Sequence, residues 1–220
     1  MRKARRAPKG AIFDQDGLLF DTEVIFERSW LKAGEKFGLP VDLELTRRLS
    51  GCGRKELAAV IDETFPGTDS EAMVEFTHCL AAETQLAMTP VVKPGVREIL
   101  EFCRSGGVRT AIASSSMRHL VDHNLAAAGL TGFFDAVVTG RDVEHGKPSP
   151  DIFLLAAERI GIAPPDCVVF EDAFPGIRAA YAAGCRAVLI PDRRLPTPEI
   201  LELCETYSTL SDAIAPIWAV

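Results

Sequence analysis

The chain has no stretch close to the roughly 20 consecutive apolar residues that a membrane-spanning helix needs, and no apolar secretory segment follows its basic start. Its six cysteines include no Cys-x-x-Cys pair, and no histidine lies at metal-ligand spacing from them. These absences exclude a membrane span and a structural zinc site. We therefore expect a cytoplasmic protein whose cysteines act as small buried hydrophobes.

Positive charge is also scarce, because the 24 Lys and Arg residues are outnumbered by 31 Asp and Glu residues, which gives a net charge of −7. Nucleic acids and anionic membranes are bound through basic surfaces, so neither is an expected partner. The exception is a cluster at the start of the chain, which we interpret as a solvated tail: Arg2, Lys3, Arg5, Arg6 and Lys9.

Internal repeats and low-complexity tracts are absent as well. What is present is a composition with 47% hydrophobic and 25% charged residues, which is typical of a globular protein with a packed core. A length of 220 residues allows one substantial domain with a smaller companion.

Short apolar runs that predict buried strands alternate with helical patterns along most of the chain. Strands alternating with helices favour a parallel sheet that is covered by helices on both faces, so we predict an α/β fold with a Rossmann-like core. The predicted strands cover residues 11–13, 109–113, 136–138, 167–170 and 187–190.

Residues 22–89 interrupt this alternation, since they show helical periodicity and no strand pattern. We predict an all-helical cap domain there, inserted after the first strand, and a core domain made of residues 1–21 and 90–220. The apolar residues of the insertion are assigned to its own packing, among them Phe26, Trp30, Met73 and Ala87.

Two carboxylates leave the first strand together in Asp14-Gln15-Asp16-Gly17. Residues two apart in a strand point the same way, and the glycine lets the backbone turn sharply. Alone, this pattern favours a solvated turn after a strand over a catalytic site.

Three further polar groups follow later strands or loops of the predicted sheet. They are Ser114-Ser115-Ser116, Lys147 in the segment 146–151, and Glu171-Asp172. In a parallel sheet the ligand crevice lies beyond the carboxyl ends of the strands, so all of these groups are expected to meet there. For Ser116, however, we favour a role as the N-cap of the next helix.

The order of these motifs resembles the haloacid dehalogenase-like hydrolases, within the subgroup that carries a helical cap. Asp14-Gln15-Asp16-Gly17 comes first, and the later motifs are Ser114, Lys147 and Glu171-Asp172. The resemblance covers nearly the whole chain, and four motifs in order are far more specific than any one of them.

The resemblance implies a phosphatase that acts on small phosphorylated metabolites. Asp14 would be the nucleophile that forms an aspartyl-phosphate, and Asp16 would be the general acid and base. Lys147 and Ser114 would complete the catalytic group by holding the phosphate. Backbone N–H groups near Gln15 and Ser115 would bind the substrate.

Four carboxylates around a phosphate require cations, because each like-charge pair near 4 Å costs roughly 4 kcal/mol at an effective dielectric of 20. Oxygen ligands without His or Cys suit Mg²⁺. The resemblance implies that Asp14, the Asp16 backbone carbonyl and Asp172 hold the ion, with Glu171 holding a metal-bound water or Lys147.

The cap is expected to supply most substrate contacts, and Arg54 in a glycine-flanked loop is its candidate, with a solvated loop arginine as the alternative. A second candidate function is a beta-phosphoglucomutase-type mutase. Such mutases carry a His where this chain has Phe26 and a Lys-Asn pair where it has Met117-Arg118, so a phosphatase is favoured.

Two candidates come from other classes: a phospho-acceptor signalling module of the receiver type and a non-catalytic sugar-phosphate-binding protein. A receiver places its acceptor Asp mid-chain and has no helical insertion, whereas a pure binder does not need Asp16. The substrate stays open among sugar phosphates and nucleotides, and we expect a monomer because the capped subgroup completes its site within one chain.

Overall fold

A single parallel sheet organises the protein. The computed structural model describes residues 6–219, in which six strands pair in the order β3-β2-β1-β4-β5-β6. The predicted α/β class with a Rossmann-like sheet is confirmed. The strands are β1 (Gly10–Phe13), β2 (Arg109–Ser114), β3 (Ala136–Thr139), β4 (Cys167–Glu171), β5 (Arg186–Leu189) and β6 (Glu205–Thr206).

Strand β6 lies in a stretch for which the sequence predicts only helices. Two residues are too few to show a period of two, so this edge strand leaves no sequence signal. It pairs with β5 and extends the sheet on the side away from β1.

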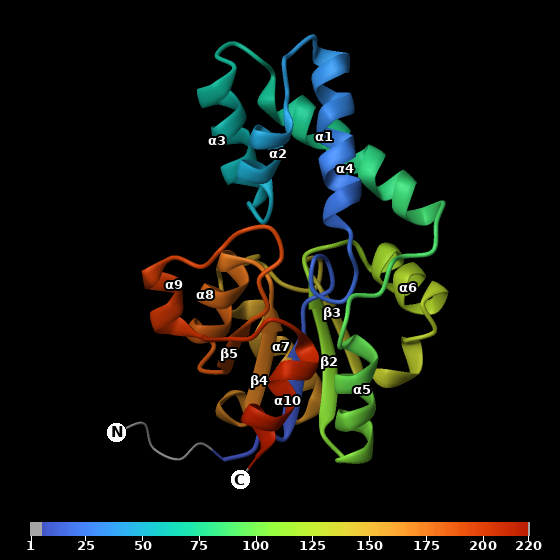
Figure 1. Ribbon diagram of the computed structural model, residues 1–220, viewed down its shortest axis with the longest axis vertical. Coiled ribbons are helices and arrows are strands. Elements are labelled where there is room, and N and C mark those ends of the chain that lie inside the picture. The colour runs from blue at the N-terminus through green and yellow to red at the C-terminus, as the bar shows by residue number, and fades with distance from the viewer. Residues whose placement is uncertain (1–5, 220) are drawn as a thin grey trace.

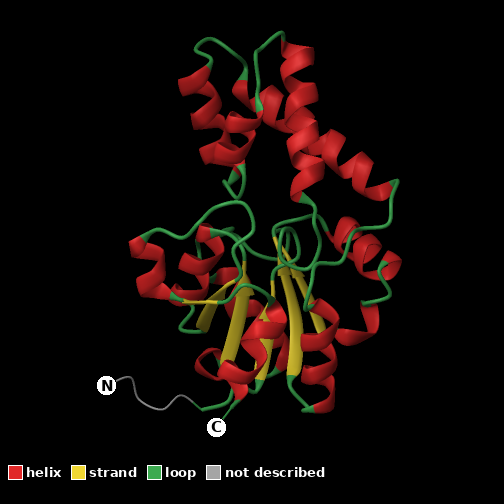
Figure 2. Ribbon diagram, in the orientation of Figure 1, coloured by secondary structure: helices red, strands yellow, loops and turns green. Residues whose placement is uncertain are grey.

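Helices cover both faces of the sheet, as Figures 1 and 2 show. Successive strand residues point to opposite faces: Phe13 and Phe170 pack in one core cluster, and Ile12 and Val169 in the other. The first cluster includes α5 (Val96–Ser105), α6 (Arg118–Ala127) and α10 (Leu210–Trp218). The second includes α7 (Asp151–Ile160), α8 (Phe174–Ala182) and α9 (Pro198–Leu203), and short 3₁₀ turns lie at Thr131–Phe133 and Pro164–Asp166.

Residues 22–89 contain four helices and no strand. The helices are α1 (Glu23–Phe37), α2 (Leu43–Leu49), α3 (Arg54–Thr64) and α4 (Ser70–Leu86). They share a core of their own in which Ile61 and Met73 are fully buried and Trp30 nearly so. In Figure 1 this layer lies beyond the carboxyl ends of the strands.

The phase predicted for the last of these helices is partly wrong. Ala87, expected in the packing, is exposed at the end of α4, whereas Thr77 and Gln85 are buried. The reason is that α4 packs against α6 near its end, where the Asn124 Nδ2 group donates a hydrogen bond of 3.1 Å to Gln85 Oε1. A buried polar pair of this kind gives no apolar stripe in the sequence.

The six cysteines are free, but they do not share one environment. Four are buried as expected, Cys103, Cys167, Cys185 and Cys204. The expectation is wrong for the other two, since Cys79 is exposed on α4 and Cys52 is half-buried in the loop between α2 and α3. Both lie in the helical layer, whose small core leaves more surface per residue.

Residues 1–5 of the basic tail lie outside the described part of the chain. Within it, Lys9 Nζ lies 3.7 Å from Asp166 Oδ2, and both side chains are largely exposed. Between residues 6 and 219 there is no helix with the length and apolar character that crossing a bilayer requires.

Substitution of Phe170 tests the core on the first face of the sheet. The ring is fully buried and stacks on Phe13 at a centroid distance of 5.1 Å, so Phe170→Ala is expected to lower the free energy of unfolding by about 3–5 kcal/mol. Denaturant unfolding measures the change. Tyr181→Ala removes a ring that is 57% exposed and serves as the control, with an expected change within about 0.5 kcal/mol. Equal losses in the two variants would contradict this assignment of the core.

Candidate active site

The Asp14-Gln15-Asp16-Gly17 segment leaves β1, which lies between β2 and β4 in the sheet. The Asp14 N–H still donates to the Phe170 carbonyl at 3.1 Å, after which the chain turns back on itself. The N–H groups of Leu19 and Phe20 donate to the Gln15 carbonyl at 2.9 and 3.2 Å. This turn holds both aspartates at the carboxyl end of β1.

Glycine is required at position 17 for two reasons. Its φ of +82° lies in the left-handed region, and a Cβ there would come within 2.2 Å of Asp172 Oδ2. The backbone at Gly17 therefore approaches the carboxylate after β4 more closely than any side chain would allow.

Lys147 connects the carboxylates of two strands. Its ammonium donates to Asp14 Oδ1 at 2.5 Å, to Glu171 Oε1 at 2.6 Å and to the Ala113 carbonyl at 2.9 Å. An ammonium has three donors, so all of them are used. The side chain is 8% exposed, and the charge is buried together with its partners.

Asp16 is held by serines at the carboxyl end of β2. The Ser116 hydroxyl donates to Asp16 Oδ2 at 2.7 Å, and the Ser114 hydroxyl lies 3.4 Å from the same oxygen. The Ser114 oxygen in turn accepts the Ser116 N–H at 3.0 Å. The interpretation of Ser116 as an N-cap is wrong, because α6 begins later, with Met117 at the N-cap position and no side-chain cap.

Asp14, Glu171 and Asp172 form a carboxylate cluster in which one oxygen from each lies within 4.8 Å of the others. Asp172 Oδ1 is buried and has no hydrogen-bond partner among residues 6–219. An unpartnered buried carboxylate oxygen is costly, and three hard oxygen donors suit a divalent cation such as Mg²⁺. The residues present therefore fit a magnesium ion.

Burial dominates the charge states of this cluster. It raises the pKa of Asp14 to about 8, an effect that Lys147 opposes and that Glu171 and Asp16 reinforce. Burial also raises the pKa of Asp172 well above its ordinary value, with Glu171 and Asp14 adding to it. Burial alone lowers the pKa of Lys147, but the attraction of Asp14 and Glu171 outweighs it and raises that pKa. The site holds more negative charge than its lysine compensates.

Gln15 and Ser115, predicted to bind substrate, follow β1 and β2 at the same edge of the sheet. Within the described residues, their backbone N–H groups have no hydrogen-bond acceptor. The Gln15 side chain is fully buried, and neither its Oε1 nor its Nε2 has a hydrogen-bond partner in the described part of the chain. Free donors of this kind are what an anion such as phosphate needs.

The helical layer reaches this site through the loop between α2 and α3. A Cβ at Gly51 would lie 3.4 Å from the Cβ of Ala173, the residue after Asp172. The neighbouring Ser50 hydroxyl donates to Glu23 Oε2 at 2.5 Å, and burial raises the pKa of Glu23, although this hydrogen bond opposes the rise.

Arg54, the predicted cap residue for substrate, is bound elsewhere. Its guanidinium donates to Glu75 Oε2 at 2.7 Å and lies 3.6 Å from Glu71 Oε2, both on α4. No residue of the carboxylate cluster is among its partners in the described chain. Its contact with substrate stays a prediction.

Sequence reasoning missed Lys93 and the role of Ser116. The Lys93 ammonium donates to the Gly17 carbonyl at 2.6 Å and to Asp192 Oδ1 at 2.6 Å. It therefore fixes the turn that carries Asp16. Lys93 is separated from Gly17 by the whole helical insertion, so no spacing rule connects the two.

Fold and site together define a class: a parallel sheet with a helical insertion after β1 and an Asp-x-Asp pair at the sheet edge, beside a lysine and an acidic cluster. The family model of the haloacid dehalogenase-like hydrolases matches residues 8–184. The chain belongs to this family, and the predicted resemblance is confirmed.

Several relatives are named as phosphatases. The chain is 34% identical over 182 residues to a phosphorylated carbohydrates phosphatase of Thermotoga maritima, covering 82% of this chain and 83% of that one. It is 37% identical over 183 residues to the fructose-1-phosphate phosphatase YqaB of Escherichia coli, covering 81% and 94%. The predicted enzyme class, a phosphatase acting on small phosphorylated metabolites, is confirmed.

Solved structures of the family have the same fold. A family hydrolase from Deinococcus radiodurans with bound phosphate and sodium superposes with a TM-score of 0.75 at 27% identity, covering 96% of both chains. The beta-phosphoglucomutase of Clostridium difficile gives a TM-score of 0.75 at 23% identity, covering 96% and 97%. At that identity the second likeness shows the fold alone.

Gly17→Ala tests the close approach between the turn and Asp172. The new Cβ would collide with Asp172 Oδ2, so the turn must move and kcat is expected to fall by about 10²-fold. Gly38→Ala is the matched control, since Gly38 also has a positive φ, of +67°, but nothing within 4 Å of an added Cβ. Both variants should lose about 1–2 kcal/mol of stability from backbone strain. Phosphate release and unfolding are measured together, and full activity in Gly17→Ala would contradict the role of this contact.

Proposed function

We propose that the protein hydrolyses phosphate monoesters of small sugars through a covalent phosphoryl group on Asp14, with Mg²⁺ as cofactor. One observation carries the proposal: the two carboxylates that follow β1 have different kinds of partner, one charged and one neutral. Asp14 is paired with the buried ammonium of Lys147, whereas Asp16 accepts from the hydroxyl of Ser116. The first arrangement suits a nucleophile, and the second suits a group that exchanges protons.

In the first step a carboxylate oxygen of Asp14 attacks phosphorus. The bond between phosphorus and the ester oxygen breaks, and that oxygen leaves with a proton from Asp16. In the second step a water oxygen attacks phosphorus and gives its proton to Asp16. The bond to Asp14 breaks and inorganic phosphate is released, so both aspartates return to their starting state.

Asp14, Asp172 and the backbone carbonyl of Asp16 would hold the magnesium ion. Glu171 is bound to Lys147 and would orient a water of the ion. When bound, Mg²⁺ offsets the charge that builds on the phosphoryl oxygens. The clustering of the carboxylates and the raised pKa of Asp172 support this assignment.

In this proposal the Ser114 hydroxyl and the N–H groups of Gln15 and Ser115 bind the phosphoryl oxygens, and the positive charge of Lys147 offsets the negative charge of those oxygens. Lys147 is already buried beside Asp14, and the two N–H groups are free of other acceptors within the described residues. Donors fixed in place before the reaction stabilise the transition state without reorganising.

The helical insertion acts as a cap over this site, with residues 22–89 as one domain and residues 1–21 and 90–220 as the other. The two connecting segments run side by side: the Asp21 N–H donates to the Val91 carbonyl at 3.0 Å, and the Lys93 N–H to the Leu19 carbonyl at 2.9 Å. The two segments that connect the cap to the core therefore lie together, and the cap can pivot there to exclude water.

Sugar phosphates are the proposed substrates because the phosphatases of Thermotoga maritima and Escherichia coli are named for phosphorylated carbohydrates and fructose 1-phosphate. Nucleotides are the second class to test. The predicted monomeric state and cytoplasmic location stay predictions.

The contacts at positions 26 and 118 favour hydrolysis over the mutase reaction. Phe26 packs edge-on against His78 at a centroid distance of 5.5 Å and offers no hydrogen bond. Arg118 is paired with Asp122 at 2.9 Å along α6. Neither side chain provides the polar contact to a sugar bisphosphate that the corresponding mutase residues provide.

Replacing each aspartate by asparagine separates the two proposed roles. Asp14→Asn is expected to abolish phosphate release from fructose 1-phosphate and p-nitrophenyl phosphate, because an amide cannot form the phosphoryl intermediate. Asp16→Asn is expected to lower kcat by about 10²–10⁴. Asp122→Asn removes an exposed carboxylate of α6 and should retain full activity. Activity of Asp14→Asn above about a tenth of wild type would remove this residue from the nucleophile role.

Chelation tests the metal assignment. EDTA should silence the enzyme and added Mg²⁺ should restore it. In Asp172→Asn, loss of one ligand is expected to raise the Mg²⁺ concentration for half-maximal activity by about tenfold or more. Asp122→Asn should follow the wild-type titration. Turnover that is unaffected by EDTA contradicts the proposed cofactor.

A further inference from the structure

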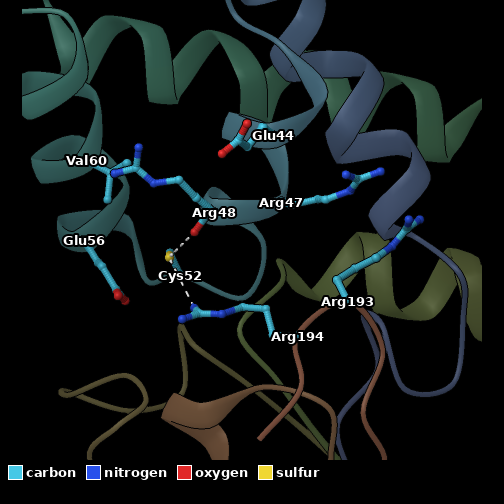
Figure 3. Close-up of a pocket in the computed structure, with 8 residues that line it drawn as sticks. All are labelled: Glu44, Arg47, Arg48, Cys52, Glu56, Val60, Arg193 and Arg194. Carbon is cyan, nitrogen blue, oxygen red and sulfur yellow. Dashed lines mark hydrogen bonds between the residues drawn. The ribbon is translucent and has the colours of Figure 1, made fainter. Parts of the chain in front are cut away.

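A cavity lies between the cap and the core, outside the carboxylate cluster. Its volume is about 430 Å³, which is in the usual range for small-ligand pockets. One wall is formed by α2 and α3, and the other by the segment after β5, as Figure 3 shows. The residues that line it are Glu44, Arg47, Arg48, Cys52, Glu56, Val60, Arg193 and Arg194.

The lining of this arginine pocket carries four guanidinium groups and two carboxylates. Such an excess of positive charge contrasts with the protein as a whole, whose net charge is −7. A concave surface of one charge sign concentrates ligands of the opposite sign. The pocket therefore favours an anion.

Most donors of these guanidinium groups are uncommitted. Arg47 forms no hydrogen bond or ion pair within residues 6–219, and Arg48 lies 4.0 Å from Glu63 Oε2. Arg194 contacts no carboxylate there, but lies 3.9 Å from Cys52 Sγ and 4.9 Å from the centre of the Phe174 ring. Arg193 lies between 3.7 and 3.9 Å from three carboxylates, too far for strong hydrogen bonds.

The arginines come in two pairs from opposite sides. Arg47 and Arg48 belong to α2 in the cap, and Arg193 and Arg194 to the core segment. Guanidinium groups bind phosphate and carboxylate through paired N–H donors. An anion held by both pairs would draw the cap onto the core.

The pocket adjoins the loop that carries the catalytic carboxylates. Phe174, under the Arg194 guanidinium, follows Asp172 by two residues, and Gly51, next to Cys52, contacts Ala173. Arg54 is not among the lining residues, so this pocket is separate from the predicted contact of that arginine.

We propose that the arginine pocket binds a second anionic group, a phosphate or carboxylate, that closes the cap on the core. The group is either carried by the substrate itself or is a free anion. The inference rests on the proposed phosphatase function only if the substrate carries this second group.

The test uses a double variant, Arg47→Gln with Arg194→Gln, which removes one guanidinium from each wall. Arg28→Gln is the matched control, because Arg28 is exposed on α1 and does not line the pocket. Thermal unfolding of the wild type, the double variant and Arg28→Gln checks that each is folded.

The first arm compares KM for fructose 1-phosphate with KM for fructose 1,6-bisphosphate. If the substrate carries the second group, the double variant should raise KM for the bisphosphate by about tenfold, which corresponds to the loss of roughly one charge-assisted contact. KM for the monophosphate should not change. An equal rise for both substrates would overturn the proposal, since it would show a general disturbance of the active site.

The second arm titrates inorganic phosphate into Asp14→Asn protein by calorimetry, with and without the two arginine substitutions. If a free anion occupies the pocket, the substitutions should remove one of two binding events while the Arg28→Gln control keeps both. Unchanged KM values together with unchanged phosphate binding would overturn the proposal. The binding arm remains decisive even if neither sugar phosphate is hydrolysed, so failure of the proposed function is distinguished from failure of this inference.

Discussion

The buried ammonium of Lys147 holds the site together. It lies between Asp14 and Glu171, which follow β1 and end β4, and it also reaches the Ala113 carbonyl in β2. A buried charge is tolerated only when it is paired and hydrogen-bonded, and removal of one partner of such a group costs about 3–5 kcal/mol. The position of Lys147 therefore constrains three neighbouring strands at once.

The negative charge around this lysine has a structural consequence. Burial raises the pKa of Asp14 to about 8 and that of Asp172 well above its ordinary value, so the site favours any further cation. The parallel sheet imposes this crowding, because every strand presents its carboxyl end at the same edge. Gly17 and Gly176 then allow backbone to pack against carboxylates, since an added Cβ would come within 2.2 Å of Asp172 and 2.0 Å of Glu171.

Two of the places where the helical insertion meets the rest of the chain differ in their chemistry. The connecting segments pair backbone to backbone near Asp21 and Val91, whereas the arginine pocket is lined by four arginines, two from each side. In the proposed closure, the backbone pairing is the pivot, and an anion in the positive pocket would alter the balance between open and closed arrangements. Anion recognition and cap closure would then be linked in one cavity.

The sequence by itself determined the α/β class, the helical insertion and the four motifs at the sheet edge. Apolar runs, helical periodicity and short polar motifs are local patterns that can be read from the sequence. Because parallel strands end at the same edge of the sheet, the polar motifs that follow them lie together there. Ser116, Lys93 and the arginine pocket were decided by tertiary structure alone. Lys93 binds Gly17, from which the whole insertion separates it in the sequence, Ser116 turns toward Asp16 instead of capping α6, and Arg47 of α2 lines one pocket with Arg194 of the segment after β5. Contacts of this kind depend on the packing of distant segments, and no spacing in the sequence encodes them.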